Sequence, residues 1–147
     1  MAGLILLLHG PNLNRLGQRQ PHIYGKETLA DVVARVRKVC EPHGVEVKDF
    51  QSNHEGAIID FVQTHGPQAQ GIILNPGALA HYGYALRDCL EDIGRPVVEI
   101  HISNVHRREP FRHQLVLAPV AVGQIVGLGP IGYEYAAHYL LQLMTSE

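Results

Sequence analysis

Five short apolar segments recur along this chain of 147 residues. Most of them are nearly continuous in apolar character and rich in β-branched residues, which is typical of strands buried on both faces of a parallel sheet. Because such a sheet must be covered on both sides, the segments between the strands are expected to be helices. The five apolar segments are residues 4–8, 45–50, 71–74, 97–102 and 120–126.

Helical periodicity fills the intervals between these segments. Apolar side chains between residues 29 and 40 recur at i, i+3 and i+4 spacing, with Thr28 as a good N-cap and Gly44 as a stop. Further helices are expected at residues 57–64, 81–93 and 131–144. Five β-then-α units predict an α/β fold, a flavodoxin-like doubly wound five-stranded parallel sheet of order 2-1-3-4-5 with helices on both faces.

The composition is that of an ordinary globular protein. Hydrophobic residues make up 46% and the formal net charge is −2, so nothing indicates a nucleic-acid-binding stripe or a membrane patch. No internal repeat or linker divides the sequence, and we expect residues 1–147 to form a single domain. Cys40 and Cys89 are expected to be buried small residues rather than a disulfide, and the absence of a signal-like start favours a cytoplasmic protein.

One predicted loop is much longer than the fold requires. Residues 10–25 join the first strand to its helix, whereas such connections usually take about 2–6 residues. The loop is rich in Gly and Pro and carries Arg19 and Tyr24. It leaves the carboxyl edge of the sheet, where open α/β sheets bind their ligands. We therefore expect a lid over about residues 11–25.

Polar side chains follow three of the predicted strands. Asn12 follows the first strand, Asn75 comes directly after the third, and His101 lies near the end of the fourth. Because the carboxyl ends of parallel strands meet at one edge, these side chains are expected to converge there with the lid. Further polar residues after the third and fourth strands are His81, Ser103, Arg107, Arg108 and Arg112.

Taken singly, each of these residues has an ordinary structural explanation. Tyr24 is consistent with a loop aromatic packed on the sheet edge, and His101 with a hydrogen-bonded core histidine; only their joint placement favours an active site. Residues 127–132 match the pattern G-x-G-x-x-G of dinucleotide-binding sites. Only fifteen residues follow and no second βαβ half remains, so a tight turn with close helix–strand packing is favoured there.

The chemistry open to these side chains is limited. A tyrosine has a pKa near 10, is about 0.1% ionised at pH 7, and is a useful base only where its anion is stabilised. Arg19 lies on the same loop as Tyr24, and Arg108 can approach from the fourth strand; arginine stays charged and does not compete for the proton. A phenolate base with a histidine acid suits removal of a proton α to a carbonyl followed by loss of a β-hydroxyl, which is a dehydration.

Four stretches of the sequence resemble one enzyme family, in register along almost the whole chain. They are GPNLNRLGQRQPHIYG from residue 10, ILNPGALAHYGYALRD from residue 73, EIHISNVHRREPFR from residue 99 and GLGPIGY from residue 127. Together they resemble the type II 3-dehydroquinate dehydratases. The resemblance implies a flavodoxin-like catalytic domain that needs neither cofactor nor metal and converts 3-dehydroquinate to 3-dehydroshikimate, with loss of water through an enolate, in the shikimate pathway of aromatic amino-acid biosynthesis. It also implies a homododecamer, built as a tetramer of trimers.

The same resemblance assigns a role to individual residues. Tyr24 would remove the C2 proton, Arg19 would stabilise the Tyr24 anion from the lid, and His101 would protonate the departing C1 hydroxyl. Asn75 would hold a water at the enolate, and Asp88 would reach the site of a neighbouring subunit. The hydroxyls and carboxylate of the substrate would be bound by His81, Arg112 and the peptide groups of Ile102 and Ser103.

A few positions depart from the family pattern. Gln20 stands where an acidic residue is usual, Leu115 where a serine is common, and Gly83 and Pro110 alter the starts of helical segments. None of these changes removes a residue with a chemical role. Pro110 is acceptable if it lies in a first helical turn.

Three other functions are consistent with parts of the pattern. A flavodoxin-like flavin- or phosphate-binding protein is the main alternative, but residues 11–13 lack the Gly and hydroxyl residues of a phosphate loop. A metal hydrolase using His101 and His106 lacks a carboxylate ligand beside them. A Schiff-base dehydratase would have to use Lys26, the one lysine near the predicted edge.

Overall fold

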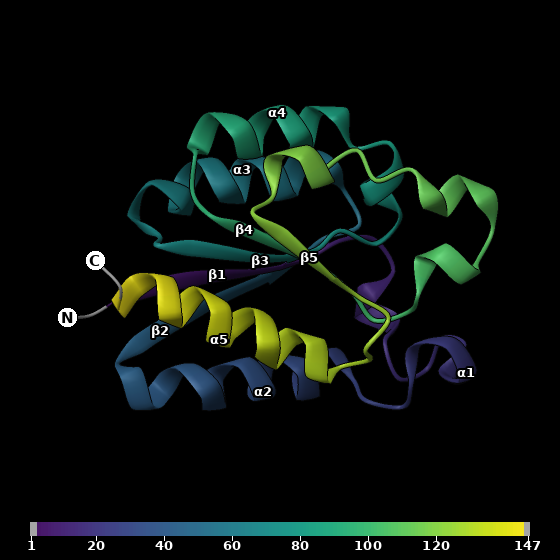
Figure 1. The fold of residues 1–147 in the computed structure, drawn as a ribbon, viewed down its shortest axis with the longest axis horizontal. Coiled ribbons are helices and arrows are strands. Elements are labelled where there is room, and N and C mark those ends of the chain that lie inside the picture. Colours follow the sequence, from purple (N-terminus) through teal and green to yellow (C-terminus); the bar gives the residue numbers. More distant parts are fainter. Residues whose placement is uncertain (1–2, 146–147) are drawn as a thin grey trace.

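Five parallel strands form one sheet in the computed structural model, which describes residues 3–145 (Figure 1). Their order across the sheet is β2-β1-β3-β4-β5, so the doubly wound order predicted from the sequence is confirmed. All the carboxyl ends of the strands therefore lie at the same edge. The strands are β1 (Gly3–His9), β2 (Val45–Gln51), β3 (Gly71–Asn75), β4 (Val97–His101) and β5 (Gly123–Val126).

Helices cover both faces of this sheet. Figure 1 shows α2 and α5 on one face and α3 and α4 on the other, with the short α1 at the carboxyl edge. The helical segments expected from the sequence are all present, with small shifts of their ends. The helices are α1 (Pro21–Tyr24), α2 (Leu29–Cys40), α3 (Glu55–His65), α4 (Tyr84–Ile93) and α5 (Ile131–Thr145).

The side chains of β1 separate the two halves of the core. Ile5 and Leu7 pack with α2 and α5, whereas Leu6 and Leu8 pack on the opposite face with α3 and α4. All four side chains are fully buried. Successive residues of a strand point to opposite faces, so a strand that is covered on both sides needs apolar residues at every position. Burial of each such side chain contributes on the order of 1.5–3 kcal/mol.

The start and end of α2 follow from local sequence. The Thr28 hydroxyl accepts from the N–H of Asp31 at 3.2 Å, and the Asp31 carboxylate accepts from the N–H of Thr28 at 3.0 Å. This reciprocal capping satisfies two N–H groups that would otherwise lack partners, and the bond to the Thr28 backbone is the main reason that the pKa of Asp31 is lowered. A 3-10 turn follows Cys40 and ends at Gly44, whose φ of 68° suits glycine.

Two predicted boundaries are wrong. Residues 118–120 form a 3-10 turn that contains Pro119, and β5 pairs with β4 only from Gly123 onward. Residues 77–81 also form a 3-10 turn, so α4 begins at Tyr84 rather than at residue 81. The first turn of α4 is capped by a side chain of α3, because the N–H of Leu86 donates to Glu55 at 2.9 Å. A cap that comes from a distant helix gives no local signal in the sequence.

The glycine pattern near the C-terminus proves to be structural. Gly127 and Gly129 have φ values of 86° and 74°, which places both in the left-handed region that favours glycine. A Cβ atom at Gly132 would lie 2.6 Å from Cδ1 of Ile100, so this glycine lets α5 approach β4 closely. The interpretation of residues 127–132 as a tight turn with close packing is confirmed.

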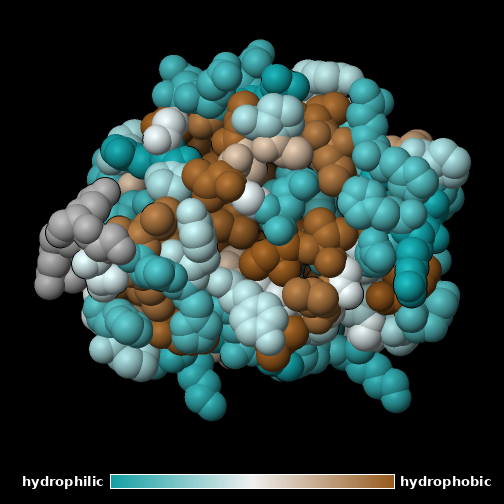
Figure 2. Space-filling model, in the orientation of Figure 1, coloured by the Kyte–Doolittle hydropathy of each residue, from teal (hydrophilic) through white to brown (hydrophobic). Residues whose placement is uncertain are grey.

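The edge of the sheet formed by β5 is exposed. Figure 2 looks onto this face, where apolar surface gathers around β5 and α5. The exposed apolar side chains near it include Val122, Tyr135 and Tyr139. In the described part of the chain, no helix is both long enough and apolar enough to cross a membrane.

Candidate active site

The lid begins where β1 and β3 end side by side. The N–H of Gly10 donates to the carbonyl oxygen of Asn75 at 2.8 Å. A Cβ atom at Gly10 would lie 2.1 Å from the carbonyl oxygen of Pro76, so only glycine allows this approach. Asn12 then adopts a left-handed φ of 71°, and its N–H donates to the side chain of Asn53 at 2.9 Å. These contacts fix the first residues of the lid against the carboxyl edge of the sheet.

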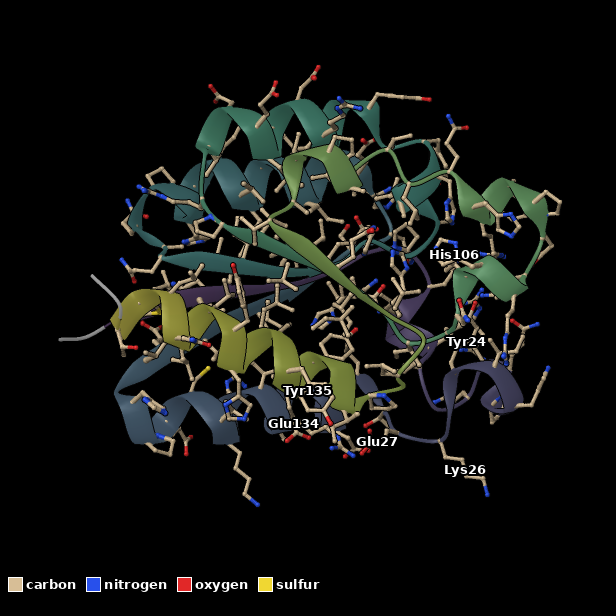
Figure 3. The ribbon with its side chains drawn as sticks, viewed as in Figure 1. Tyr24, Lys26, Glu27, His106, Glu134 and Tyr135 are labelled. Carbon is tan, nitrogen blue, oxygen red and sulfur yellow. The ribbon has the colours of Figure 1, made fainter. Side chains whose placement is uncertain are left out.

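Tyr24 ends the short helix α1 and is held between two arginines. The helix follows Gln20, whose φ is 40°, and has Pro21 at its first position. The Tyr24 side chain is buried, and its hydroxyl accepts from Nη1 of Arg108 at 2.7 Å. The guanidinium carbon of Arg19 lies 4.6 Å from the centroid of the same ring. Figure 3 shows Tyr24 between α1 and the segment that follows β4.

Arg108 connects Tyr24 to the end of β4. The same Nη1 atom that meets Tyr24 donates to the hydroxyl of Ser103 at 3.2 Å, and Nε lies 3.7 Å from the Glu109 carboxylate. The sequence led us to expect guanidinium groups beside the phenol. In the structure, Arg108 donates a hydrogen bond to the phenol oxygen, and Arg19 stacks on the face of the ring.

A pocket of about 410 Å³ opens beside Tyr24. Two of the residues predicted to bind substrate, Ile102 and Ser103, line it together with Arg108. Gly127 and Gly129 also line it, and a Cβ atom at Gly127 would lie 2.9 Å from Cβ of Asn104. The pocket therefore combines hydrogen-bond donors and positive charge with room for a small polar molecule.

His101 is oriented by a carboxylate that the sequence analysis missed. Its Nε2 atom lies 2.5 Å from Oε2 of Glu99, and both side chains are buried. The other carboxylate oxygen, Oε1, has no hydrogen-bond partner among the described residues. Because Nε2 is engaged by Glu99, Nδ1 is the ring nitrogen left to meet a substrate. The signal for this pair was a glutamate two residues before the histidine in an apolar strand, which places both on one face of the sheet.

His81 and Arg112 lie on the same side of the site as His101. Nδ1 of His81 is 2.9 Å from the carbonyl oxygen of Gln114. The His81 ring meets Phe111 edge-on at 5.7 Å, and the guanidinium carbon of Arg112 lies 4.6 Å from the Phe111 centroid. Burial is the main reason that the pKa of His81 is lowered, and the charge of Arg112 acts in the same direction, whereas the contact with the Gln114 carbonyl opposes the shift. His81 is therefore favoured as a neutral hydrogen-bonding group.

Asn75 points to the opposite face of the sheet. Its amide nitrogen donates to the hydroxyl of Tyr133 at 2.7 Å, and its carbonyl oxygen accepts from the N–H of Gly77 at 3.2 Å. Tyr133 is fully buried in α5, and burial raises its pKa, so it remains a phenol. Asn75 is thus held at the end of β3 by Tyr133, the last residue of the GLGPIGY motif, to which the sequence analysis gave no role.

His9 is a second buried histidine at this edge. It is the register partner of Asn75, it is fully buried, and its ring centroid lies 5.9 Å from that of Tyr133. Neither ring nitrogen has a hydrogen-bond partner among the described residues. Burial lowers the pKa of His9 from 6.5 to about 4, although the charge of Asp49 acts weakly against this. The imidazole is therefore neutral at physiological pH.

The predicted site residues form two groups around the ends of β3 and β4. Tyr24, Arg19, Ile102 and Ser103 lie on the lid side with Arg108. The second group is His101, His81 and Arg112, linked by their electrostatic influence on His81. Two predicted residues belong to neither group: Asn75 is bonded to Tyr133, and Asp88 is exposed on α4.

Two departures from the family pattern have a structural explanation. Pro110 occupies the first position of a 3-10 turn (Pro110–His113), as expected for a tolerated proline. The N–H of Gly83 donates to the carbonyl oxygen of Leu79 at 2.7 Å, and a Cβ atom at Gly83 would lie 2.7 Å from that oxygen. A serine at position 83 would therefore require the preceding turn to shift.

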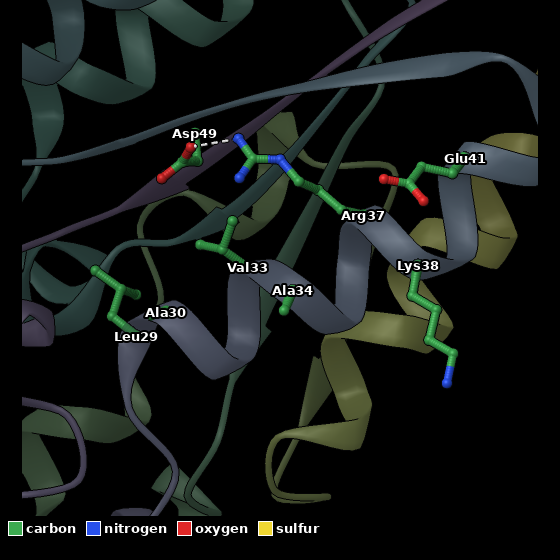
Figure 4. Close-up of a pocket in the computed structure, with 8 residues that line it drawn as sticks. All are labelled: Leu29, Ala30, Val33, Ala34, Arg37, Lys38, Glu41 and Asp49. Atoms are coloured by element: carbon green, nitrogen blue, oxygen red, sulfur yellow. Dashed lines mark hydrogen bonds and ion pairs between the residues drawn. The ribbon is translucent and has the colours of Figure 1, made fainter.

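A larger hollow, of about 550 Å³, lies away from all these residues. Figure 4 shows it along α2, on the side of the helix that faces β2, where Arg37 forms an ion pair with Asp49. Its lining includes none of the residues predicted for the site. Among residues 3–145, no three His, Cys, Asp or Glu side chains are grouped closely enough to hold a metal ion.

Known proteins resemble this chain over nearly its whole length. The family described as class II dehydroquinase matches residues 3–141. The 3-dehydroquinate dehydratase of Roseiflexus castenholzii is 56% identical over 137 residues, which cover 93% of this chain and 87% of that protein. The enzyme of the same name from Bacillus subtilis is 51% identical over 142 residues, covering 97% and 96%.

Solved structures agree with this relationship. The crystal structure of type II dehydroquinase from Butyrivibrio crossotus has a TM-score of 0.91 and 47% identity, covering 95% of this chain and 97% of that one. The type II dehydroquinase from Propionibacterium acnes also has a TM-score of 0.91, with 38% identity and coverage of 97% and 98%. The order of the sheet, the motifs at its carboxyl edge and the similarity to these relatives all agree. The chain belongs to the class II dehydroquinase family.

Proposed function

We propose that this protein is a 3-dehydroquinate dehydratase, which converts 3-dehydroquinate to 3-dehydroshikimate in the shikimate pathway of aromatic amino-acid biosynthesis. The observation that supports this most directly is the buried Tyr24 hydroxyl, which accepts a hydrogen bond from Arg108 beside a pocket lined by Ile102 and Ser103. The reaction requires only proton transfers and the departure of a hydroxyl, and the side chains at this edge can supply both.

In the first step, the Tyr24 phenolate removes the C2 proton, and the electrons move onto the adjacent carbonyl to form an enolate. The positive charges of Arg108 and Arg19 stabilise the phenolate before it takes up the proton, since arginine stays charged throughout. The enolate then needs a hydrogen-bond donor, and the rigidly held Asn75 is our candidate to position a water there.

In the second step, the enolate collapses and the C1–O bond breaks. His101 gives its proton to the departing hydroxyl, which leaves as water. Glu99 holds Nε2 of this imidazole and stabilises it when it is positively charged. We propose an anti elimination, in which the proton and the hydroxyl leave from opposite faces of the substrate ring.

The remaining groups bind substrate. The peptide groups of Ile102 and Ser103, together with His81 and Arg112, are proposed to bind the hydroxyls and the carboxylate of the substrate. Their positions after β3 and β4 place both pairs at the same edge as Tyr24 and His101. We further propose that residues 11–25 act as the lid over this pocket.

The assembly is also part of this proposal. We infer a homododecamer, a tetramer of trimers, in which Asp88 completes the site of a neighbouring subunit in the cytoplasm. The exposure of Asp88 on α4 leaves it accessible to another copy of the chain.

The conjugated carbonyl of 3-dehydroshikimate absorbs ultraviolet light more strongly than the substrate, so turnover can be followed directly. The purified protein should give this absorbance from 3-dehydroquinate at the same rate with and without a chelator. Absence of product at high enzyme concentration would overturn the proposed activity.

A further inference from the structure

One arginine of α2 joins the end of the lid to α5. The guanidinium of Arg35 donates from Nε to both oxygens of the Glu27 carboxylate, at 2.9 and 3.1 Å, and from Nη2 to Oε1 at 2.6 Å. Its third nitrogen, Nη1, forms an ion pair with Glu134 in the first turn of α5. Figure 3 shows Glu27 and Glu134 close together at the start of α5. We call these three residues the Arg35 network.

The Arg35 network is positioned to act on the lid. Glu27 lies three residues after Tyr24, and the short connection between them contains Gly25, whose φ is 85°. Glu134 directly follows Tyr133, the residue that holds the Asn75 amide. The network therefore fixes Glu27 to α2 and α5, two helices that pack together in the core.

The chain that enters the lid, at Gly17, packs against the backbone of Lys26 and Glu27, where the chain leaves the lid. Gly17 has a φ of 90°, and a Cβ atom there would lie 2.9 Å from the carbonyl oxygen of Lys26 and 3.1 Å from that of Glu27. The chain entering the lid thus rests directly on the chain leaving it. Residues 18–25 form a closed loop whose two ends meet beside the Arg35 network.

This arrangement divides the lid into a fixed and a movable part. Tyr24, next to the fixed end, is buried and bonded to Arg108. Arg19 lies near the other end of the loop and stacks on the Tyr24 ring. Between them Gln20 has a strained φ of 40° without being glycine, which is typical of positions where backbone changes conformation.

We propose that the Arg35 network is the anchor of the lid and that Glu27 and Arg35 are positioning residues, which keep Tyr24 against Arg108 while residues 18–23 move. The proposal rests on the role of Tyr24 as the base given above. It predicts that weakening the network releases the lid and displaces the base, although neither Glu27 nor Arg35 touches the substrate. A role in α2–α5 packing alone would change stability without changing the lid.

The chain offers a matched control for this test. Arg37 lies on the same helix as Arg35 and forms an ion pair with Asp49 at 2.8 Å, away from the lid (Figure 4). The two pairs have comparable exposure, with side chains 35% and 31% exposed for Arg35–Glu27 and 45% and 37% for Arg37–Asp49. Glu27→Gln and Asp49→Asn each remove one carboxylate charge and keep the size of the side chain. If the two variants differ in cleavage or in kcat, the cause is therefore the link between the lid and α5, because both variants lose an ion pair.

Two readouts separate the lid from overall stability. The first is the rate of trypsin cleavage after Arg19, identified by mass spectrometry, without substrate. The second is kcat and KM for 3-dehydroquinate. In Glu27→Gln we expect faster cleavage and a kcat lowered by roughly three- to tenfold, the scale expected for partly exposed ion pairs acting together. Asp49→Asn should match the wild type in both, and high salt should accelerate cleavage of the wild type more than that of Glu27→Gln.

Arg35→Gln and the double variant complete the test. Each single change disrupts the same network. The double variant Glu27→Gln/Arg35→Gln should therefore lower kcat no further than the single change with the larger effect. Equal cleavage and kcat in Glu27→Gln and Asp49→Asn would overturn the anchor. Faster cleavage with an unchanged kcat would overturn the positioning of Tyr24. Cleavage is measured without substrate, so it tests the anchor independently of the activity. A wild type that fails to turn over 3-dehydroquinate would overturn the proposed function instead.

Discussion

The phenol oxygen of Tyr24 and the guanidinium of Arg108 meet at 2.7 Å, although 84 residues separate them in the sequence. A buried hydroxyl facing a permanent positive charge is well placed to carry a negative charge of its own. Because Arg108 also donates to Ser103, the proposed base and the proposed substrate-binding segment are connected by one side chain. In the proposed mechanism, Arg108 therefore positions the base without having to touch the reacting carbon.

Replacing Arg108 should harm turnover more than replacing Arg19. Arg108→Gln removes a charge-assisted hydrogen bond to the phenol oxygen, and we expect kcat to fall roughly 10- to 100-fold. Arg19→Ala removes a contact with the face of the ring, so its effect on kcat should be smaller. Steady-state kinetics would measure both losses, with thermal melting as the control for the fold. Equal losses of kcat in the two variants would contradict the larger role of Arg108.

Glu99 should matter through His101. In Glu99→Gln the side chain keeps its size but loses the charge that stabilises the imidazolium, so kcat should fall by about 10- to 100-fold while KM changes little. Thermal melting would show whether the buried substitution also disturbs the fold. Equal losses in kcat for Glu99→Gln and for a control such as Glu91→Gln on the exposed side of α4 would contradict the assigned role.

His9 should make the protein sensitive to acid. Burial lowers its pKa to about 4, whereas the unfolded chain takes up this proton near 6.5, so the folded state is favoured fully above pH 6.5. As the pH falls from about 6.5 to 4, this contribution to the free energy of unfolding is lost, up to about 3 kcal/mol. Urea unfolding of the wild type and of His9→Leu at several pH values would measure it. The stability of the wild type should fall more steeply on acidification than that of His9→Leu, and parallel curves would show that His9 does not titrate in this way.

Asp88 tests the proposed assembly. If it completes a neighbouring site, Asp88→Ala should raise KM or weaken assembly, whereas Asp92→Ala on the same helix should do neither, since both carboxylates are exposed in one subunit. Sedimentation velocity would report the assembly and steady-state kinetics the affinity. Wild-type values of both for Asp88→Ala would reject its role at the interface.

Local patterns in the sequence were sufficient to predict the sheet and its order. The strand at Gly3–His9 is apolar at nearly every position because both faces are covered, and Thr28 with Asp31 caps α2 through bonds three residues apart. The errors arose where the deciding contact is distant. Val120 looks like part of a strand, yet pairing begins only at Gly123, and α4 begins where a glutamate of another helix can cap it.

The same limit applies to the site. Tyr24, His101 and Ser103 could be placed at one edge because parallel strands bring their ends together. The approach of Arg108 to Tyr24 was also expected, and the structure confirms it. The partner of Asn75 could not be predicted, since Tyr133 reaches it from the last helix. Glu99 is the exception, because its spacing of two residues from His101 in a strand was visible in the sequence.

Measuring turnover by Tyr24→Phe is the most direct test of the account. The change removes one oxygen and leaves the ring for Arg19 to stack on, so the fold and the affinity for 3-dehydroquinate should persist. We predict a kcat lower by roughly a hundred- to ten-thousandfold, the contribution of a positioned base. A Tyr24→Phe enzyme that turns over 3-dehydroquinate at close to the wild-type rate would show that another group removes the proton.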